Sequence, residues 1–127
     1  RLAKDPNAYS PEVREKIEWR IGITGKALQL AYPRGVKIAF GTDAGVFPHG
    51  ENGKEFGFMV EAGMPPIEAI LSATVVNAGI LGIADKTGTL EPGKFADVIA
   101  TDESPLQNIH TLESVSFVMK DGVVYKR

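Results

Sequence analysis

The first third of the chain carries apolar residues at helical spacing. Residues 10–12, Ser-Pro-Glu, form a typical helix start, with a hydroxyl N-cap, a proline at the first helical position and an early acid. The apolar positions that follow on one helical face are Val13, Ile17, Ile21 and Leu28. The pattern predicts one helix over residues 11–31, with Gly22 and Gly25 inside it as sites of close packing or of a break.

The middle of the chain changes from a β-type pattern to a helical one. Residues 36–40 are a β-rich run of strand length, and the glycine-containing turn at residues 41–45 closes it. Three helices are predicted next. The first spans residues 52–62, the second begins at Pro65-Pro66 and the third spans residues 75–81. A single strand between helices resembles one βα unit that lacks partner strands.

Beyond residue 82 the pattern changes to turns and short strands. Residues 96–100 form a short strand, and residues 114–119 and 123–126 alternate in the manner of strands around Asp121-Gly122. This dipeptide strongly indicates a two-residue β-hairpin. Because the predicted order of helix, strand, helices and β does not close into a self-sufficient domain, we expect the chain to be a portion of a larger fold.

Composition excludes several classes of function. The 127 residues include 14 Lys+Arg and 16 Asp+Glu, so a net charge of −2 provides no basic field for a nucleic-acid backbone. The absence of cysteine excludes disulfides, a thiolate nucleophile and cysteine-based metal sites. No apolar run approaches the roughly 18–20 residues of a membrane span. We therefore expect neither nucleic acid nor a membrane as a partner.

Asp43 is the sharpest candidate for catalysis. It lies just past the C-terminal end of the strand predicted at residues 36–40, between Gly41 and Gly45. In α/β folds ligands and catalytic groups gather above the C-terminal ends of strands. A carboxylate there can bind a divalent metal and take a proton from metal-bound water. The alternative interpretation is an aspartate that caps a tight turn, since Asp and Gly are ordinary turn residues.

Few other side chains could complete a metal site with Asp43. His49 lies in a loop bounded by Pro48 and Gly50, where a structural role and a functional role are both open. His110 lies in the β-rich part, away from other ligand candidates, which favours a structural role. A catalytic zinc normally takes three protein ligands, so this chain alone is not expected to hold a complete hydrolytic site.

Four stretches, taken together and in order, resemble the metal-dependent amidohydrolase superfamily, near its imidazolonepropionase-like and Xaa-Pro-dipeptidase-like branch. They are residues 36–45 (VKIAFGTDAG), 63–82, 88–98 (GTLEPGKFADV) and 118–125 (VMKDGVVY). The resemblance implies an α/β fold, in which residues 1–85 are the last strand and flanking helices of a (β/α)₈ barrel. Residues 86–127 are then the C-terminal part of a small accessory β-sandwich. Such barrels need about 250 residues, which agrees with a chain that holds only part of one.

The resemblance also implies a chemistry. Members of the family use divalent metal, most often one or two zinc ions, to activate water against carbon–nitrogen bonds in small-molecule amides, cyclic amides or dipeptides. By this resemblance Asp43 ligates the metal and shuttles the proton of the attacking water, and His49 contacts the substrate. The family's paired histidines, bridging lysine and middle-strand histidines have no counterparts in this sequence, so we expect the chain alone to be inactive.

Two other interpretations stay open at the level of sequence. In the first, the chain is a non-catalytic α/β module that folds as a monomer and ignores metal, and the loop around Asp43 is merely a turn. In the second, the open strand edges pair with a second copy, which makes the chain a self-associating interaction fragment and a homo-oligomer.

Overall fold

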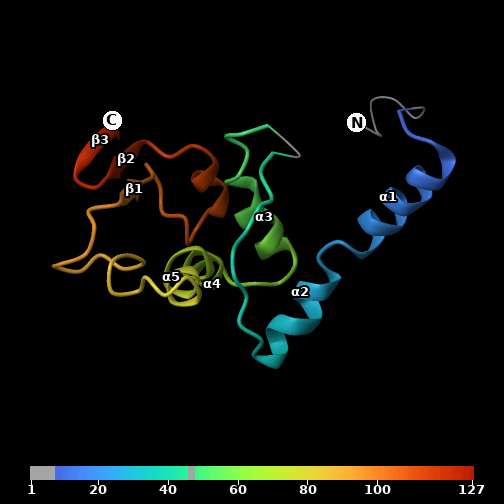
Figure 1. Cartoon of the computed structure of the whole chain (residues 1–127), viewed down its shortest axis with the longest axis horizontal. Helices are drawn as coiled ribbons and strands as arrows, with labels where there is room; N and C mark the ends of the chain where they lie inside the picture. Colours follow the sequence, from blue (N-terminus) through green and yellow to red (C-terminus); the bar gives the residue numbers. More distant parts are fainter. Residues whose placement is uncertain (1–7, 46–47) are drawn as a thin grey trace.

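Helices occupy one part of the molecule and a small antiparallel sheet the other (Figure 1). The computed structural model describes residues 8–45 and 48–127. Residues 1–7 of the predicted barrel portion and residues 46–47 of the predicted loop lie outside the described residues. From α1 at one end the chain runs through α3 in the middle to the sheet at the other end (Figure 1).

The helix predicted over residues 11–31 forms as two helices. Helix α1 spans Pro11–Ile23 and begins at Pro11, as predicted, and α2 spans Lys26–Ala31. The predicted hydroxyl cap is not formed, because the Ser10 hydroxyl donates to the Glu12 carboxylate at 2.8 Å and accepts no hydrogen bond from an N–H of the helix start. The break lies at Gly25, whose φ of +80° is a left-handed conformation that glycine adopts without a steric penalty. Among the described residues, none of the helices has both the length and the apolar character needed to cross a membrane.

The strand predicted at residues 36–40 is not formed, and this prediction was wrong. After a 3-10 turn at Tyr32–Arg34 the segment runs past α3 without strand pairing (Figure 1). A strand needs a neighbour to satisfy its ladder of N–H and C=O groups. The three strands that the structure describes pair only with one another, so the apolar composition of residues 36–40 is not enough to make them a strand here.

The next helices carry much of the small core. Helix α3 spans Lys54–Glu61 and is followed by Gly63 at a φ of +99°, the C′ residue that the sequence predicted. Pro66 begins α4, Pro66–Leu71, as predicted. The helix predicted at residues 75–81 forms in part as α5, Asn77–Ile80, but it is not separate, because a π-turn at Ser72–Val76 joins α4 to α5 without a break. Sequence periodicity does not reveal such a one-turn widening of a helix.

The C-terminal part forms the predicted β structure. Strands β1 (Val98–Ala100), β2 (Phe117–Lys120) and β3 (Val123–Lys126) make an antiparallel sheet in the order β1-β2-β3. The β2–β3 turn is the predicted hairpin, with positive φ at both Asp121 (+48°) and Gly122 (+76°). A 3-10 helix at Ile109–Glu113, which the sequence did not predict, packs on α3.

The core is small for the mass of the chain. It is centred on Met59, Met64 and Ala69, with the rings of Phe40 and Phe56 stacked beside it at a centroid distance of 4.3 Å. The chain exposes 9235 Å², whereas a compact monomer of 13.6 kDa exposes about 6,600 Å². The excess includes large apolar side chains on α1 and α2, which leave an extensive apolar surface for further contacts.

Candidate functional site

Asp43 ends the extended segment that crosses the core, at the start of the loop before α3. Its φ of +51° lies in the left-handed region, where aspartate is one of the few residues enriched besides glycine. The side chain is exposed, and no side chain or N–H of the described residues forms a hydrogen bond with its carboxylate. The carboxylate is therefore accessible to a ligand in this part of the structure.

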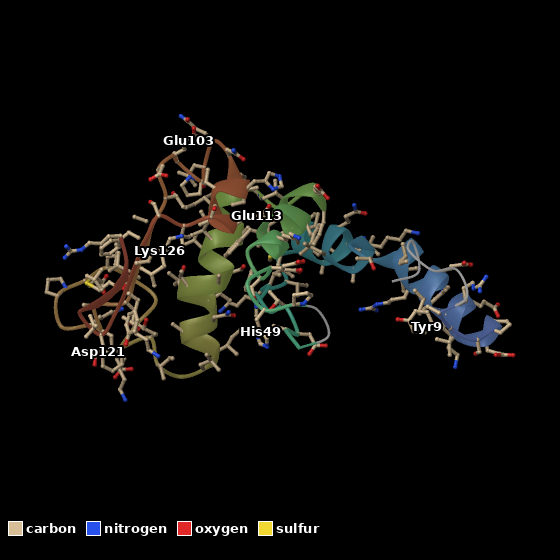
Figure 2. All side chains as sticks on the ribbon, turned by 90° about the horizontal axis from the view of Figure 1, so that it is seen from above. Tyr9, His49, Glu103, Glu113, Asp121 and Lys126 are labelled. Atoms are coloured by element: carbon tan, nitrogen blue, oxygen red, sulfur yellow. The ribbon has the colours of Figure 1, made fainter. Side chains whose placement is uncertain are left out.

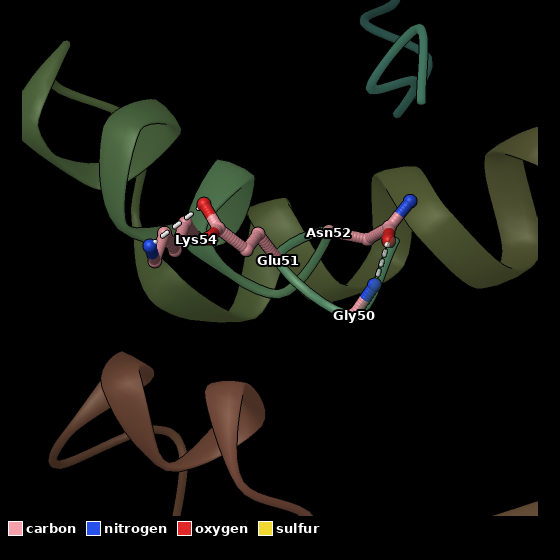
Figure 3. Close-up of polar contacts among 4 residues, drawn as sticks. All are labelled: Gly50, Glu51, Asn52 and Lys54. Atoms are coloured by element: carbon pink, nitrogen blue, oxygen red, sulfur yellow. Dashed lines mark hydrogen bonds and ion pairs between the residues drawn. The ribbon is translucent and has the colours of Figure 1, made fainter. Parts of the chain in front are cut away.

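Asn52 ties together the two ends of the loop that begins at Asp43. Its side-chain amide Nδ2 donates to the hydroxyl of Thr42, directly before Asp43, at 2.9 Å. Its Oδ1 accepts from the backbone N–H of Gly50 at 3.3 Å, as Figure 3 shows. One amide side chain thus closes a loop that carries both candidate residues, Asp43 and His49.

The helix formed by α4, the π-turn and α5 contacts the same segment at Phe40. The side-chain amide of Asn77 donates to the carbonyl of Phe40 at 2.9 Å, and the N–H of Phe40 donates to the carbonyl of Ser72 at 3.4 Å. Ser72 is fully buried and is the first residue of the π-turn. Both backbone polar groups of Phe40 therefore have hydrogen-bond partners in this helix.

Asn52 and Asn77 are functional candidates that the sequence patterns did not single out. Position 52 lies at the start of one predicted helix, and position 77 lies inside another, in the stretch 63–82 that resembles the family. The sequence offers one indication for Asn52: asparagine is a common turn residue, and position 52 lies at the end of the loop that begins at Asp43. Nothing local points to Asn77, because its partner Phe40 lies 37 positions away.

A hollow of about 260 Å³ opens beside Thr42 and the first turns of α3. It is lined by Thr42, Glu51, Asn52, Lys54, Glu55 and Phe58. Lys54 Nζ lies 2.9 Å from Glu51 Oε2 (Figure 3), and the hydrogen bond that Lys54 donates to this carboxylate raises the pKa of Lys54. Partial burial raises the pKa of Glu55. The hollow therefore combines charges of both signs next to the residue that precedes Asp43.

The structure does not join His49 to Asp43 by a hydrogen bond within the part it describes. His49 is exposed in a turn of the loop before α3, where Figure 2 labels it. His110 lies far along the chain, pairs through Nδ1 with Glu113 Oε1 at 2.7 Å, and faces Gly57 of α3. Its contacts are those of a structural residue.

The described residues do not form a complete metal site. Nowhere in residues 8–45 and 48–127 do three His, Asp or Glu side chains come together in a group that could hold a metal ion. Asp43 can supply oxygen ligands from one side chain, which is fewer than the three protein ligands typical of a catalytic zinc. Among the described residues, Asp43 thus fits one ligand position of such a site, and the other ligands are not supplied.

Comparison with known proteins relates the chain to a family of hydrolytic enzymes. The ochratoxinase of Aspergillus niger is 42% identical over 106 residues, which cover 80% of this chain and 22% of that protein. Its crystal structure superposes with a TM-score of 0.77 over 98% of this chain. The crystal structure of a Xaa-Pro dipeptidase with bound methionine in the active site is 52% identical, with a TM-score of 0.79, and the match covers 81% of this chain and 25% of that one.

A further solved structure, a prolidase complexed with N-methylphosphonate-L-proline, gives a TM-score of 0.82 at 28% identity, covering 99% of this chain and 32% of that one. The chain thus spans between 22% and 32% of the length of these relatives. The match to the family sequence pattern itself extends over residues 15–126, nearly the whole chain. These matches show an α/β fold of the amidohydrolase type, and the chain belongs to the amidohydrolase family.

Proposed function

We propose that this chain forms part of a hydrolase that cleaves a carbon–nitrogen bond in an amide, a cyclic amide or a dipeptide. Its family membership supports this class of reaction, and the names of two relatives, ochratoxinase and Xaa-Pro dipeptidase, support small-molecule substrates. The observation that carries the proposal is the carboxylate of Asp43, exposed in a left-handed turn at the end of a segment that two asparagines hold.

In this proposal the architecture is that of a partial barrel. Residues 1–85 contribute the last strand of a (β/α)₈ barrel and its flanking helices, and residues 86–127 contribute part of a small β-sandwich. Two observations support it: residues 36–40 run without a strand partner, and the apolar side chains of α1 and α2 lie exposed. Neighbouring strands supplied by the rest of the family fold would satisfy both features.

The role proposed for Asp43 is that of a metal ligand and proton acceptor. A bound divalent metal, zinc before others, supplies a water molecule with a lowered pKa. The carboxylate of Asp43 would help to hold the metal and would accept a proton from the attacking water. The remaining ligands come from parts of the family fold to which this chain has no matching residues.

A hybrid enzyme tests the proposal. The chain replaces the matching quarter of the Xaa-Pro dipeptidase, to which it is 52% identical, and the hybrid is assayed with a Xaa-Pro dipeptide. We expect the hybrid to turn over and to bind metal by elemental analysis, and the isolated chain with added zinc to do neither. Asp43→Asn should lower kcat of the hybrid by about 100-fold or more, since acid–base groups contribute about 10²–10⁴-fold.

Asparagine is the right replacement because it also tolerates a left-handed φ, so the backbone at position 43 is preserved. Asp85→Asn, the same change at another exposed aspartate in a turn, is the matched control and should leave kcat unchanged. Equal activity of the two variants, or robust turnover by the isolated chain, would overturn the proposal.

A further inference from the structure

We propose that Asn52 and Asn77 are positioning residues for Asp43, an inference that rests on the function proposed for this aspartate. Asn52 lies in the turn before α3 and Asn77 begins α5, and each forms a hydrogen bond to a residue within three positions of Asp43. Neither reaches the carboxylate itself. Together they restrain the backbone at Phe40 and Thr42, next to Asp43.

Asn77 acts through Phe40. The Phe40 carbonyl lies three positions before Asp43, in a segment that pairs with no strand among the described residues. The Nδ2 group of Asn77 supplies the donor at 2.9 Å, while the π-turn that precedes Asn77 brings the Ser72 carbonyl to the N–H of Phe40. Single π-turns within α-helices frequently occur at functional sites.

Asn52 acts through the two ends of the loop. It donates to the Thr42 hydroxyl on one side and accepts from the Gly50 N–H on the other, at 2.9 and 3.3 Å (Figure 3). Both halves of its side-chain amide are therefore used. Because Thr42 directly precedes Asp43, this contact limits how far the loop and the carboxylate can move.

The two asparagines contact the segment at different residues, Thr42 and Phe40, so losing either contact releases a different part of the backbone next to Asp43. A displacement of about 1 Å at a catalytic group can cost about 100-fold in rate. Loss of either asparagine contact is therefore expected to lower kcat by about 10- to 100-fold. The KM should stay within threefold of the parent value, since neither amide touches the substrate in this proposal.

Substitution of asparagine by aspartate distinguishes the two positions, because the Asn77 amide donates to Phe40, whereas the Asn52 amide both donates and accepts. Asn77→Asp places an acceptor against the Phe40 carbonyl and should lower kcat, whereas Asn77→Gln retains a donor and should restore part of it. Asn52→Asp keeps an acceptor for Gly50 N–H and can accept from the Thr42 hydroxyl, so kcat should be retained, whereas Asn52→Leu should lower it.

Asn108→Asp is the control, because Asn108 also uses Oδ1 as an acceptor, at the N-cap of the distant 3-10 helix. All variants are made in the hybrid enzyme and compared by kcat, KM, melting temperature, and hydrogen exchange of a peptide covering residues 36–45. Faster exchange in that peptide, with a lowered kcat and a melting temperature within about 3 °C of the parent, is the result expected for Asn77→Asp and Asn52→Leu.

The outcomes separate this inference from the function on which it rests. If Asp43→Asn abolishes turnover while Asn77→Asp and Asn52→Leu keep the kcat of Asn108→Asp, the inference is overturned and the proposed function stands. If kcat falls only in proportion to the amount of unfolded protein, the two residues are merely structural and the inference is again overturned. If Asp43→Asn keeps full turnover, both proposals fall.

Discussion

A Cβ atom at position 53 would lie 2.5 Å from the carbonyl oxygen of Leu112. The same atom would lie 2.9 Å from the Cα of Glu113, so the glycine before α3 packs directly on the backbone of the 3-10 helix at Ile109–Glu113. One turn later, Gly57 faces the imidazole of His110. Two glycines thus form the surface of α3 on which the C-terminal part of the chain rests.

This contact predicts that Gly53→Ala destabilises the protein by about 1–3 kcal/mol, the cost of overpacking against a neighbour that cannot move. The backbone conformation is not the obstacle, because Gly53 has the ordinary helical φ of −61°. Gly57→Ala should cost less, since the His110 ring can turn away and alanine gains about 1 kcal/mol of helix propensity. Urea unfolding of the chain measures both free energies.

Gly79→Ala is the matched control for these two changes. Gly79 lies in α5, and no atom beyond its chain neighbours and its own helix backbone lies within 4 Å of the position that an added methyl group would take, so alanine should stabilise the protein by up to about 1 kcal/mol. A Gly53→Ala protein as stable as Gly79→Ala would show that α3 and the 3-10 helix are not in tight contact.

The β2–β3 hairpin gives a second prediction. Its two turn residues, Asp121 and Gly122, both have positive φ, and their N–H groups donate to the Asp97 carboxylate at 2.8 Å and to the Ala96 carbonyl at 3.2 Å. Gly122→Ala should destabilise the protein by about 1–2 kcal/mol, the cost of a left-handed conformation for a residue with a Cβ.

Asp121→Asn keeps the turn, because asparagine is favoured at this position of a type I′ turn, and it should change the free energy of unfolding by less than about 0.5 kcal/mol. Equal effects of the two substitutions would mean that the left-handed geometry is not what limits this hairpin.

Local chemistry made much of the fold predictable from the sequence. The start of α1 at Pro11, the stop of α3 at Gly63 and the hairpin at Asp121-Gly122 each depend on neighbouring residues alone, and the structure confirms all three. Residues 36–40 show the limit of this approach. Their composition favours a strand, but strand formation depends on partners elsewhere, and within the described residues the segment has none.

The same distinction between local features and features that depend on distant residues applies to the candidate site. Asp43 could be found from its place after a β-rich run and between glycines, and its left-handed turn is a local property. The hydrogen bond from Asn77 to Phe40 joins residues 37 positions apart and depends on a π-turn. No periodicity encodes either feature, so the support around Asp43 emerged only from the three-dimensional arrangement.

Glu55 gives a pH-dependent prediction. Partial burial raises the pKa of this carboxyl above its value in the unfolded chain, so the folded state binds the proton more tightly. Stability therefore falls as the pH rises from 4.5 through the raised pKa. Glu55→Gln removes the ionised form and should give a slightly higher melting temperature than the parent at pH 7.

At pH 3.5 the two proteins should melt at the same temperature, because Glu55 is then protonated in both the folded and unfolded states. The effect at pH 7 should be small, since much of the carboxyl remains in water. Glu61→Gln, the same change at an exposed position of α3, is the control. A Glu55→Gln protein that melts below the parent at pH 7 would contradict the prediction.

The last prediction concerns His49, for which substrate contact is the proposed role. His49 is exposed and precedes Gly50, whose N–H is held by Asn52, so its backbone is anchored next to the loop closure. A hydrogen bond that holds substrate and transition state equally changes KM alone, and one neutral hydrogen bond of about 0.5–1.5 kcal/mol corresponds to about a 2- to 12-fold change. His49→Ala in the hybrid enzyme should therefore raise KM for the Xaa-Pro dipeptide by that factor and leave kcat within twofold. An unchanged KM would remove His49 from the substrate site, whereas an equal loss in kcat and kcat/KM would instead assign it to the transition state.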